Sequence, residues 1–374
     1  MRVLIAPDKF KGSLDATGVC QAIEEALRES GRKLDITSIG MADGGEGTSN
    51  MLTNFSKGEI IKLKVLDPFF RPIEGFYGLS GDGETAFIEM AVASGLQLLS
   101  NEERNALLGT TYGTGQMIAD ALDRGVTSII LGVGGSGTND GGIGMGEALG
   151  ARFLDEQGKA LKPIGQNLGS IRSIDLGNLH PRAKFVTVTA ICDVSNPFFG
   201  VNGAAHVFGP QKGATPSDID FLDRGLRNFA RVVEQQLGLD LNFPGAGAGG
   251  GLGGGAKIFF NIDFRSGIEF IIEFIGLEEL VKNCDLVITG EGKMDEQTLS
   301  GKVVKGVSDL SRTFKKRLVV IVGKNELPQS KIDLLGINKV LSLVGEETSE
   351  KESFENTSRL IKKRVRDHVN PFFL

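Results

Sequence analysis

Short runs of apolar residues alternate along the chain with segments in which apolar residues recur every three or four positions. Runs such as 2–6 and 318–322 are short and almost continuously apolar, which is typical of strands buried in a parallel sheet. Between such runs, Val19, Ile23 and Leu27 fall on one helical face. This alternation indicates an α/β protein with parallel strands.

The two ends of the chain share this pattern. The elements expected there are strands at 2–6, 34–41, 285–289, 318–322 and 339–344, helices opening at Ser13 or Asp15 and near 301–313, and a charged amphipathic helix over 350–369. Because the strands alternate with helices at both ends, we predict one doubly wound domain built from residues 1–60 and 260–374.

The middle of the chain differs, since its first strands follow one another with only turns between them. The elements expected there are strands at 60–66, 73–79, 85–90, 128–133 and 185–191 and helices at 113–124 and 143–151. We therefore predict a second, mixed α/β domain, inserted into the first and covering residues 61–259.

Length and composition limit the kinds of protein to consider. The 374 residues are enough for two or three domains, and 40% hydrophobic with 24% charged residues excludes a disordered chain. A net charge of −6 argues against a generally basic nucleic-acid surface. No apolar stretch approaches ~18 residues, and the three cysteines lie far apart. We expect a cytoplasmic protein without nucleic-acid or membrane partners, of undetermined oligomeric state.

Glycine is the anomaly of the composition, with 53 residues. The segment 134–142 places Ser, Thr, Asn and Asp among five glycines after an expected strand, where backbone N–H groups can surround an anionic oxygen. A plain tight turn with Asp140 as a helix N-cap is the alternative. The run 245–256 has the composition of a flexible linker.

Nucleotide-binding motifs give a second alternative. No standard P-loop motif is present, but Gly132, Gly134 and Gly137 form a G-x-G-x-x-G pattern after an expected strand, with Asp155 about 18 residues on. This pattern would fit a nicotinamide-dependent oxidoreductase acting on a small hydroxy acid.

Acidic residues follow several expected strands. Asp43 and Glu46 lie among glycines, as do Glu291 and Asp295, and Asp193 ends the strand at 185–191. At the carboxyl ends of strands, open α/β sheets bind their ligands. Carboxylates there suit Mg²⁺, which takes one or two of them together with phosphate oxygens. Helix capping and, for Asp193, an Asx turn before Pro197 are the alternatives.

Basic residues accompany these loops. Lys9 and Lys11 follow the first strand, and Lys212 lies beside Gln211 among glycines. Cations next to glycines and acids suggest a phosphate or carboxylate ligand, because phosphoryl transfer depends on positioning and charge neutralisation. A solvated surface role is the alternative for each lysine.

Taken together, these motifs resemble the bacterial type I glycerate kinase family, and the resemblance runs nearly from end to end. The motifs that carry it are APDKFKGSL at 6–14, MADGGEG at 41–47, MAVASGL at 90–96, GTTYGTG at 109–115, GGSGTNDGG at 134–142, CDVSNP at 192–197, FGPQKGA at 208–214, the glycine run at 245–256 and TGEGKMDEQTLSGK at 289–302.

The resemblance implies an ATP- and Mg²⁺-dependent kinase that phosphorylates D-glycerate, built of a flavodoxin-like domain and a second α/β domain. It favours the 2-hydroxyl as acceptor, although the sequence leaves the 3-hydroxyl open. It also makes the 245–256 run a family motif near the site rather than a linker. A non-catalytic protein that binds glycerate or nucleotide is a further alternative.

Within this hypothesis we assign roles to the candidate residues by their chemistry. Asp193 is the expected general base, with Lys11 and Lys212 as catalytic cations, and Glu291 and Asp295 are the expected Mg²⁺ ligands. Asp43 and Asp140 are reserve metal ligands. The expected substrate- and nucleotide-binding residues are Asp8, Lys9, Ser13, Asp43, Gly44, Gly45, Ser94, Gly134, Gly135, Ser136, Thr138, Asn139, Asp140, Asn196, Gln211 and Gln297. We expect the loops of both domains to serve one shared cleft.

Overall fold

The computed structural model describes residues 1–300, 302–345 and 348–369. Within them the chain divides into two compact units, the first formed by 1–43 with 267–374 and the second by 44–266. An inserted middle portion is thus observed, but its borders lie at 43 and 267 instead of near 60 and 260. The first border lies at 43 because residues Thr48–Phe55 form a helix that packs against strands of the second unit.

The first unit contains a five-stranded sheet covered by helices. Its strands are β1 (Arg2–Ile5), β2 (Asp35–Ser38), β11 (Leu286–Met294), β12 (Arg317–Asn325) and β13 (Lys339–Ser342). Its helices are α1 (Ala16–Arg28), α9 (Gly267–Phe274), α10 (Leu277–Asn283), α11 (Val303–Thr313), α12 (Gln329–Leu335), α13 (Glu350–Glu355) and α14 (Thr357–His368). Residue 301, where the helix 301–313 was expected to begin, lies outside the described residues.

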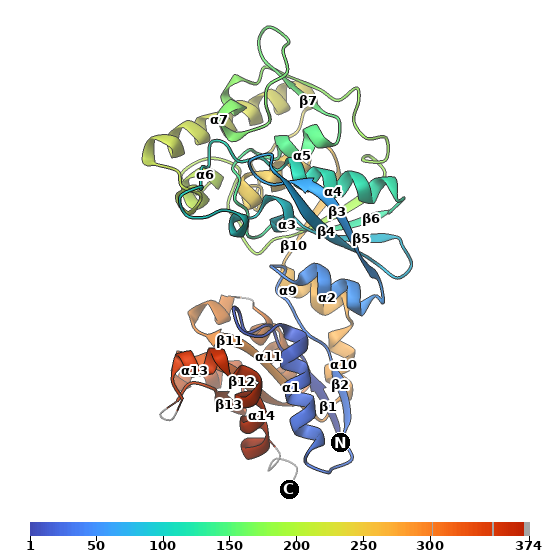
Figure 1. Ribbon diagram of the computed structural model, residues 1–374, viewed down its shortest axis with the longest axis vertical. Coiled ribbons are helices and arrows are strands. Elements are labelled where there is room, and N and C mark those ends of the chain that lie inside the picture. The colour runs from blue at the N-terminus through green and yellow to red at the C-terminus, as the bar shows by residue number, and fades with distance from the viewer. Residues whose placement is uncertain (301, 346–347, 370–374) are drawn as a thin grey trace. The chain divides into compact units, whose positions relative to one another are not determined.

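The strand order of this sheet is β13-β12-β11-β1-β2, and all neighbours are parallel. Numbered by occurrence within the unit, this is the flavodoxin-like order 2-1-3-4-5. Helices from the two ends of the chain, α1 and α14, lie side by side on one face of the sheet (Figure 1). Ile23 of α1 and Ile361 of α14 share a core with Val3 and Ile288 of the strands. The prediction of a doubly wound α/β fold is therefore confirmed.

Several elements of this unit differ from their expected extents, among them β2 and β13, which are shorter than the predicted strands at 34–41 and 339–344. The strand expected at 285–289 continues to Met294, because β12 pairs with it as far as Asn325. The tail helix is interrupted at Asn356, which separates α13 from α14. A backbone ψ of 27° with φ of −124° at Asn356 takes that residue out of the helical region.

The second unit holds a six-stranded mixed sheet and a separate two-stranded one. Its strands are β3 (Glu59–Leu66), β4 (Pro72–Leu79), β5 (Thr85–Glu89), β6 (Ser128–Gly132), β7 (Arg152–Leu154), β8 (Ser173–Asp175), β9 (Thr187–Ile191) and β10 (Asn261–Arg265). Its helices are α2 (Thr48–Phe55), α3 (Ala91–Ser94), α4 (Tyr112–Asp123), α5 (Ile143–Ala148), α6 (Ala204–Phe208), α7 (Pro216–Leu237) and α8 (Leu252–Ala256).

The large sheet has the order β10-β9-β6-β5-β4-β3. Strands β10, β9, β6 and β5 are parallel to one another, whereas β4 pairs in antiparallel fashion with both β5 and β3. Helix α2 packs against β4 and β5, and β10 pairs with β9, so both border segments belong to this unit. Helix α7 was not among the predicted elements, although Thr215 and Asp218 form a capping box at its start.

The glycine run at 245–256 is not a flexible linker. Its residues are buried, and Leu252, Ala246 and Ala248 belong to the core of the second unit. A Cβ at Gly255 would lie 2.0 Å from the backbone oxygen of Gly141, so only glycine permits this approach of two backbones. The run therefore supports the 134–142 loop from inside the unit.

Candidate functional site

The first unit carries its candidate site where β1 and β11 lie next to each other. The chain leaves β1 toward β2 on one side, while β11 continues the sheet on the other, and open α/β sheets bind ligands at such a switch point. The Asp8 backbone N–H donates to the Gly290 oxygen at 2.8 Å, which keeps the loop after β1 beside β11. A Cβ at Gly292 would lie 3.2 Å from the Lys11 nitrogen, so the two segments are in close contact.

Asp8 is a partly buried carboxylate at this edge. The pKa of Asp8 is raised to about 7, chiefly by burial and then by the negative charge of Asp43. The backbone N–H of Lys9, which donates to Asp8 Oδ1 at 2.7 Å, and the charges of Lys9 and Lys302 act in the opposite direction. The structure thus brings together Asp8, Lys9 and Asp43, which were all expected at a site.

Glu291 is a second buried carboxylate of the same edge, and its side chain is only 5% exposed. The Thr298 hydroxyl donates to Glu291 Oε1 at 2.6 Å. Burial raises the pKa of Glu291 to about 7, against the Thr298 hydrogen bond and the charge of Lys302, while Asp8 and Asp295 raise it further. Thr298 was not predicted, because nothing in its local sequence shows which carboxylate it reaches.

The turn after β11 arranges the remaining predicted residues. Asp295 Oδ1 accepts from the Gln297 backbone N–H at 2.9 Å, and Lys293 lies 3.4 Å from Asp295 Oδ2. The Lys302 ammonium donates to the Gln297 side-chain oxygen at 3.1 Å. A carboxylate cluster with lysines around it is therefore present, although Asp295 is already paired with a lysine.

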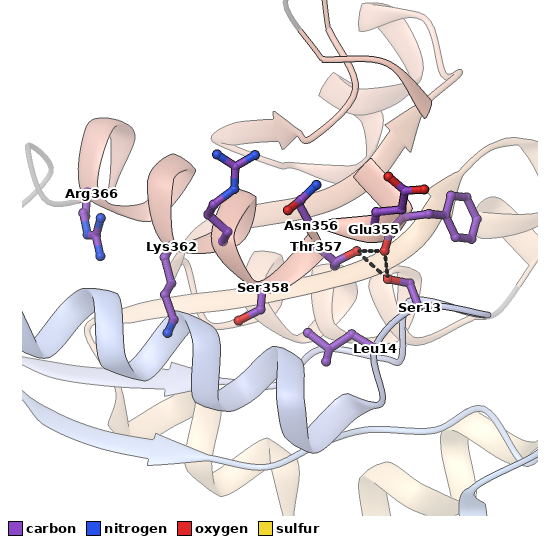
Figure 2. Close-up of a pocket in the computed structure, with 10 residues that line it drawn as sticks. Ser13, Leu14, Glu355, Asn356, Thr357, Ser358, Lys362 and Arg366 are labelled. Atoms are coloured by element: carbon purple, nitrogen blue, oxygen red, sulfur yellow. Dashed lines mark hydrogen bonds between the residues drawn. The ribbon is translucent and has the colours of Figure 1, made fainter. Parts of the chain in front are cut away.

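Ser13 points away from this cluster. Its hydroxyl donates to the Phe354 oxygen at 2.8 Å and contacts the Thr357 hydroxyl, on the wall of a surface pocket of about 500 Å³ at the start of α14 (Figure 2). Two cations of this pocket, Lys362 and Arg366, form ion pairs with Glu25 and Glu29 of α1. We interpret the pocket as a seam between α1 and α14, with Ser13 as a tether.

In the second unit, four parallel strands end at one edge of the sheet. Glu89, Gly132, Ile191 and Arg265 are their last residues, and their loops carry the predicted glycine and acidic motifs. A Cβ at Gly132 would lie 3.3 Å from the Gly44 oxygen, so the glycines of the 41–47 motif also reach this edge.

Glu89 fixes the start of α2. It was not among the residues predicted to form a site. Its carboxylate accepts from the backbone N–H of Gly47 at 3.1 Å, from that of Ser49 at 2.8 Å and from the Ser49 hydroxyl at 2.9 Å. These donors at the helix N-terminus are therefore already occupied by a carboxylate of the chain itself. The acidic last residue of a buried strand was the available signal.

The 134–142 loop has an exposed tip and a buried base. Gly134 and Gly135 are exposed, and a Cβ at Gly134 would meet nothing within 4 Å. Thr138 and Asn139 are 0% exposed, yet the Thr138 hydroxyl and both polar atoms of the Asn139 amide have no hydrogen-bond partner among the described residues. The exposed tip can accept a ligand oxygen, whereas the base faces the interior.

Asp140 is a buried structural residue of this loop. Its carboxylate accepts from the backbone N–H and hydroxyl of Thr111, at 2.7 and 2.8 Å, and from the N–H groups of Gly142 and Gly144, each at 3.1 Å. Burial raises the pKa of Asp140, although these four hydrogen bonds act to lower it. Both carboxylate oxygens are thus engaged within the unit, which favours a structural role over the reserve role as a metal ligand. The N-cap of α5 is Gly142 instead of Asp140.

Lys212 lies inside the second unit with 1% of its surface exposed. Its ammonium donates to the Ser136 hydroxyl at 2.7 Å and to the Thr138 oxygen at 2.5 Å. Burial lowers the pKa of Lys212 to about 7, although the negative charge of Asp140 acts to raise it. The expected catalytic contact between Lys212 and a ligand therefore does not fit the structure, whereas its neighbour Gln211 is exposed.

Three other predicted residues differ in their accessibility. Asp193 is exposed at the end of β9, where its Oδ1 accepts from the Ser266 hydroxyl at 3.1 Å. The Asn196 amide donates to the Asn202 oxygen at 2.8 Å and shapes the following turn. Ser94 is fully buried with its hydroxyl 2.7 Å from that of Thr114, so it supports the site from inside.

The dinucleotide fingerprint is excluded by the chain path. After β6 the chain forms the 133–142 loop and begins α5 only at Ile143, beyond all three glycines of the pattern. Asp155 follows β7, which pairs with β8 in the separate two-stranded sheet. In the dinucleotide-binding fold this acidic residue belongs to the same parallel sheet as the glycines, where it binds the ribose.

The two edges together define the kind of protein. Carboxylates and lysines at a flavodoxin-like switch point suit a cation and phosphate oxygens, and a glycine loop with an exposed tip suits an anionic group. These are the features of an α/β phosphotransferase that acts on small anionic molecules.

Comparison with known proteins identifies the family. Residues 3–371 match the model of the glycerate kinase family, and the chain belongs to that family. It is 40% identical to the glycerate kinase of Bacillus subtilis over 98% of this chain and 96% of that protein, and 42% identical to the glycerate 2-kinase of Escherichia coli over 92% and 91%. A crystal structure described as glycerate kinase 2 from Salmonella typhimurium LT2 superposes with a TM-score of 0.90 at 40% identity, covering 100% of this chain and 98% of that one.

None of the helices in the described ranges has the length and apolar character needed to cross a membrane.

Proposed function

We propose that this protein transfers the γ-phosphoryl group of ATP to the 2-hydroxyl of D-glycerate, yielding ADP and 2-phosphoglycerate. The observation that carries the proposal is the family match over residues 3–371, together with the 42% identity to a protein named glycerate 2-kinase. The carboxylates and glycine loops at the two sheet edges support it, because phosphoryl transfer needs a cation site, an anion site and a proton acceptor.

We assign the proton acceptor to Asp193. As the 2-hydroxyl oxygen forms a bond to the γ-phosphorus and the bond to the β–γ bridging oxygen breaks, the hydroxyl proton passes to the Asp193 carboxylate. Its exposure at the end of β9 supports this role, since a base must reach the substrate. The exposed glycines Gly134 and Gly135 are proposed to receive an anionic oxygen of substrate or nucleotide.

We assign the Mg²⁺ ligands to Glu291 and Asp295. Among the residues that the structure describes, no group of three or more His, Cys, Asp or Glu side chains is arranged to hold a metal ion. Mg²⁺ needs only one or two protein carboxylates, because phosphate oxygens and water complete its shell, so the carboxylates near Asp8 fit this ion. When bound, the ion would neutralise the negative charge of phosphate oxygens.

Cationic contacts to the phosphates or to the glycerate carboxylate are proposed for Lys9 and Lys11, with Lys302 added from the structure. The positive charge of Lys302 acts to lower the pKa of both Asp8 and Glu291. The expectation that the loops of both units serve one shared site stays a prediction.

The activity is tested by following ADP release in a coupled assay with D-glycerate, ATP and Mg²⁺. We expect turnover that requires all three, and the control omits glycerate to measure ATP hydrolysis alone. Absence of glycerate-dependent turnover would overturn the proposal.

The position of phosphorylation is tested by ³¹P–¹H NMR of the product. Coupling of phosphorus to a single CH proton is expected for the 2-phosphate. Coupling to a CH₂ pair would assign the 3-hydroxyl instead.

A further inference from the structure

Lys212 ends the short turn η3 (Pro210–Lys212) between α6 and α7. The next residue, Gly213, has a φ of +82°, and a Cβ there would lie 2.3 Å from the Arg104 oxygen. The turn is therefore pressed against the chain around Arg104, which leaves the Lys212 side chain directed into the unit. With 1% of its surface exposed, Lys212 is almost fully shielded from solvent.

The ammonium contacts the base of the 134–142 loop at two places. It donates to the Ser136 hydroxyl at 2.7 Å and to the Thr138 backbone oxygen at 2.5 Å. A buried ammonium is strongly unfavourable unless hydrogen bonds and an opposite charge compensate it. Here the two loop acceptors and the carboxylate of Asp140 provide that compensation.

The loop is also attached near both of its ends, and close to its C-terminal end the Asp140 carboxylate accepts from the backbone N–H and hydroxyl of Thr111. Backbone bonds hold its ends: Leu96 N–H donates to the Gly135 oxygen at 2.9 Å, Gly137 N–H to the Ser94 oxygen at 2.8 Å, and Gly141 N–H to the Gly250 oxygen at 3.0 Å. Between these points the side-chain polar atoms of Thr138 and Asn139 have no partner among the described residues. Lys212 is therefore the residue that cross-links Ser136 and Thr138 of the loop base to the η3 turn.

We propose that Lys212 is a positioning residue, which fixes the base of the 134–142 loop so that the Gly134–Gly135 tip is presented at the sheet edge for an anionic oxygen. The proposal rests on the proposed function for the identity of that oxygen, as part of ATP or glycerate. The geometry of the ammonium and its two acceptors is independent of that identity.

A residue that positions a loop differs in its effects from one that touches the reacting atoms. Removal of a positioning cation frees the loop, so amide exchange in the loop rises even without a ligand, and substrate affinity falls because the tip is no longer preorganised. Removal of a contact to the transition state lowers kcat and leaves the free protein unchanged.

The test compares hydrogen–deuterium exchange of wild type, Lys212→Met and the control Lys159→Met, which removes an exposed lysine of the same unit. We expect the amides of residues 134–142 to exchange about ten- to a hundredfold faster in Lys212→Met, with the wild-type pattern kept in Lys159→Met. The KM for ATP or glycerate should rise by a larger factor than kcat falls. Unchanged exchange in the loop, with or without a loss of kcat, would overturn the proposal.

A milder variant covers the case in which Lys212→Met does not fold. Ser136→Ala removes one acceptor of the ammonium and leaves the Thr138 oxygen in place. It should show the same local acceleration to a smaller extent, and loop exchange equal to wild type would again contradict the proposal. Because exchange is measured without substrate, this readout remains valid if the glycerate reaction itself is not observed.

Discussion

The two units differ in the chemistry that they place at the same structural feature. In each, parallel strands end at one edge of a sheet, but the first unit ends with the carboxylates of Asp8 and Glu291, and the second ends with glycine loops at Gly44 and Gly134. Carboxylates attract cations, whereas glycine backbones expose N–H groups to anions. A phosphoryl-transfer enzyme needs both, and the proposed function assigns the cation to the first unit and an anionic oxygen to the second.

The buried charges differ in the same way. Burial raises the pKa values of Asp8 and Glu291 to about 7, so these groups are poised to exchange a proton for a cation. In the second unit, by contrast, the buried charges of Glu89 and Lys212 are hydrogen-bonded to the start of α2 and to the 134–142 loop. Buried charge in the first unit thus suits ligand binding, and in the second it supports loop geometry.

The largest effect is expected from neutralising Asp193, the exposed acid after β9 in the second unit. Asp193→Asn keeps the shape of the side chain and removes the proton acceptor, so kcat should fall by ~10²–10⁴. Steady-state ADP release measures the loss. Ser266→Ala is the matched control, because it removes only the hydroxyl that donates to Asp193, and its effect should be smaller. Wild-type kcat in Asp193→Asn means that the base lies elsewhere.

Next in size is the expected effect of neutralising Glu291. Glu291→Gln retains an oxygen for the Thr298 hydroxyl but loses the charge, so kcat/KM should fall about 10²-fold, since several kcal/mol of charge stabilisation depend on the ion. Titration of activity with Mg²⁺ should show a higher requirement than in wild type. Glu296→Gln alters an exposed carboxylate in the next turn and serves as the control. An unchanged Mg²⁺ requirement in Glu291→Gln contradicts the metal assignment.

A pair of glycine substitutions separates packing from binding within the second unit. Gly250→Ala places a Cβ 2.0 Å from the Thr138 oxygen at a φ of +70°, and we expect a loss of about 3 kcal/mol in unfolding free energy. Gly134→Ala enters open space, so its stability should stay within ~0.5 kcal/mol of wild type while nucleotide or glycerate affinity falls. Urea unfolding and ligand titration measure the two effects. Equal stability losses would refute the division into a packed base and an exposed tip.

The smallest expected effect concerns the pH dependence of stability. The pKa of Glu291 is raised in the folded state, so between pH ~4.5 and ~7 the native protein binds more protons than the unfolded chain, and this residue makes stability fall as pH rises. Glu291→Gln removes that dependence. Relative to wild type, the variant should gain roughly 2 kcal/mol in unfolding free energy from pH 5 to pH 8, measured by chemical denaturation. A constant difference across that range argues that Glu291 is not protonated at pH 5.

Much of this molecule follows from local sequence. The apolar runs predicted β1, β6, β9 and β12. Ser13 or Asp15 was the predicted start of α1, and the structure selects Asp15, whose carboxylate accepts from the Gly18 N–H. The sequence also predicted that the glycine and acidic loops come directly after strands. These features depend on residues a few positions apart, which is why side-chain periodicity and turn chemistry suffice to predict them.

The strand order and the direction of the functional side chains were decided only by tertiary structure. The Thr289 hydroxyl donates to the Ala6 oxygen 283 positions away, and Lys212 reaches Ser136 across 76 positions. No local pattern shows that Lys212 is interior while its neighbour Gln211 is exposed, or that Asp140 is saturated while Asp193 is accessible. Sequence determines which chemical groups follow which strand, whereas long-range packing determines which of them face a ligand, because burial is a property of all the segments that meet at a point.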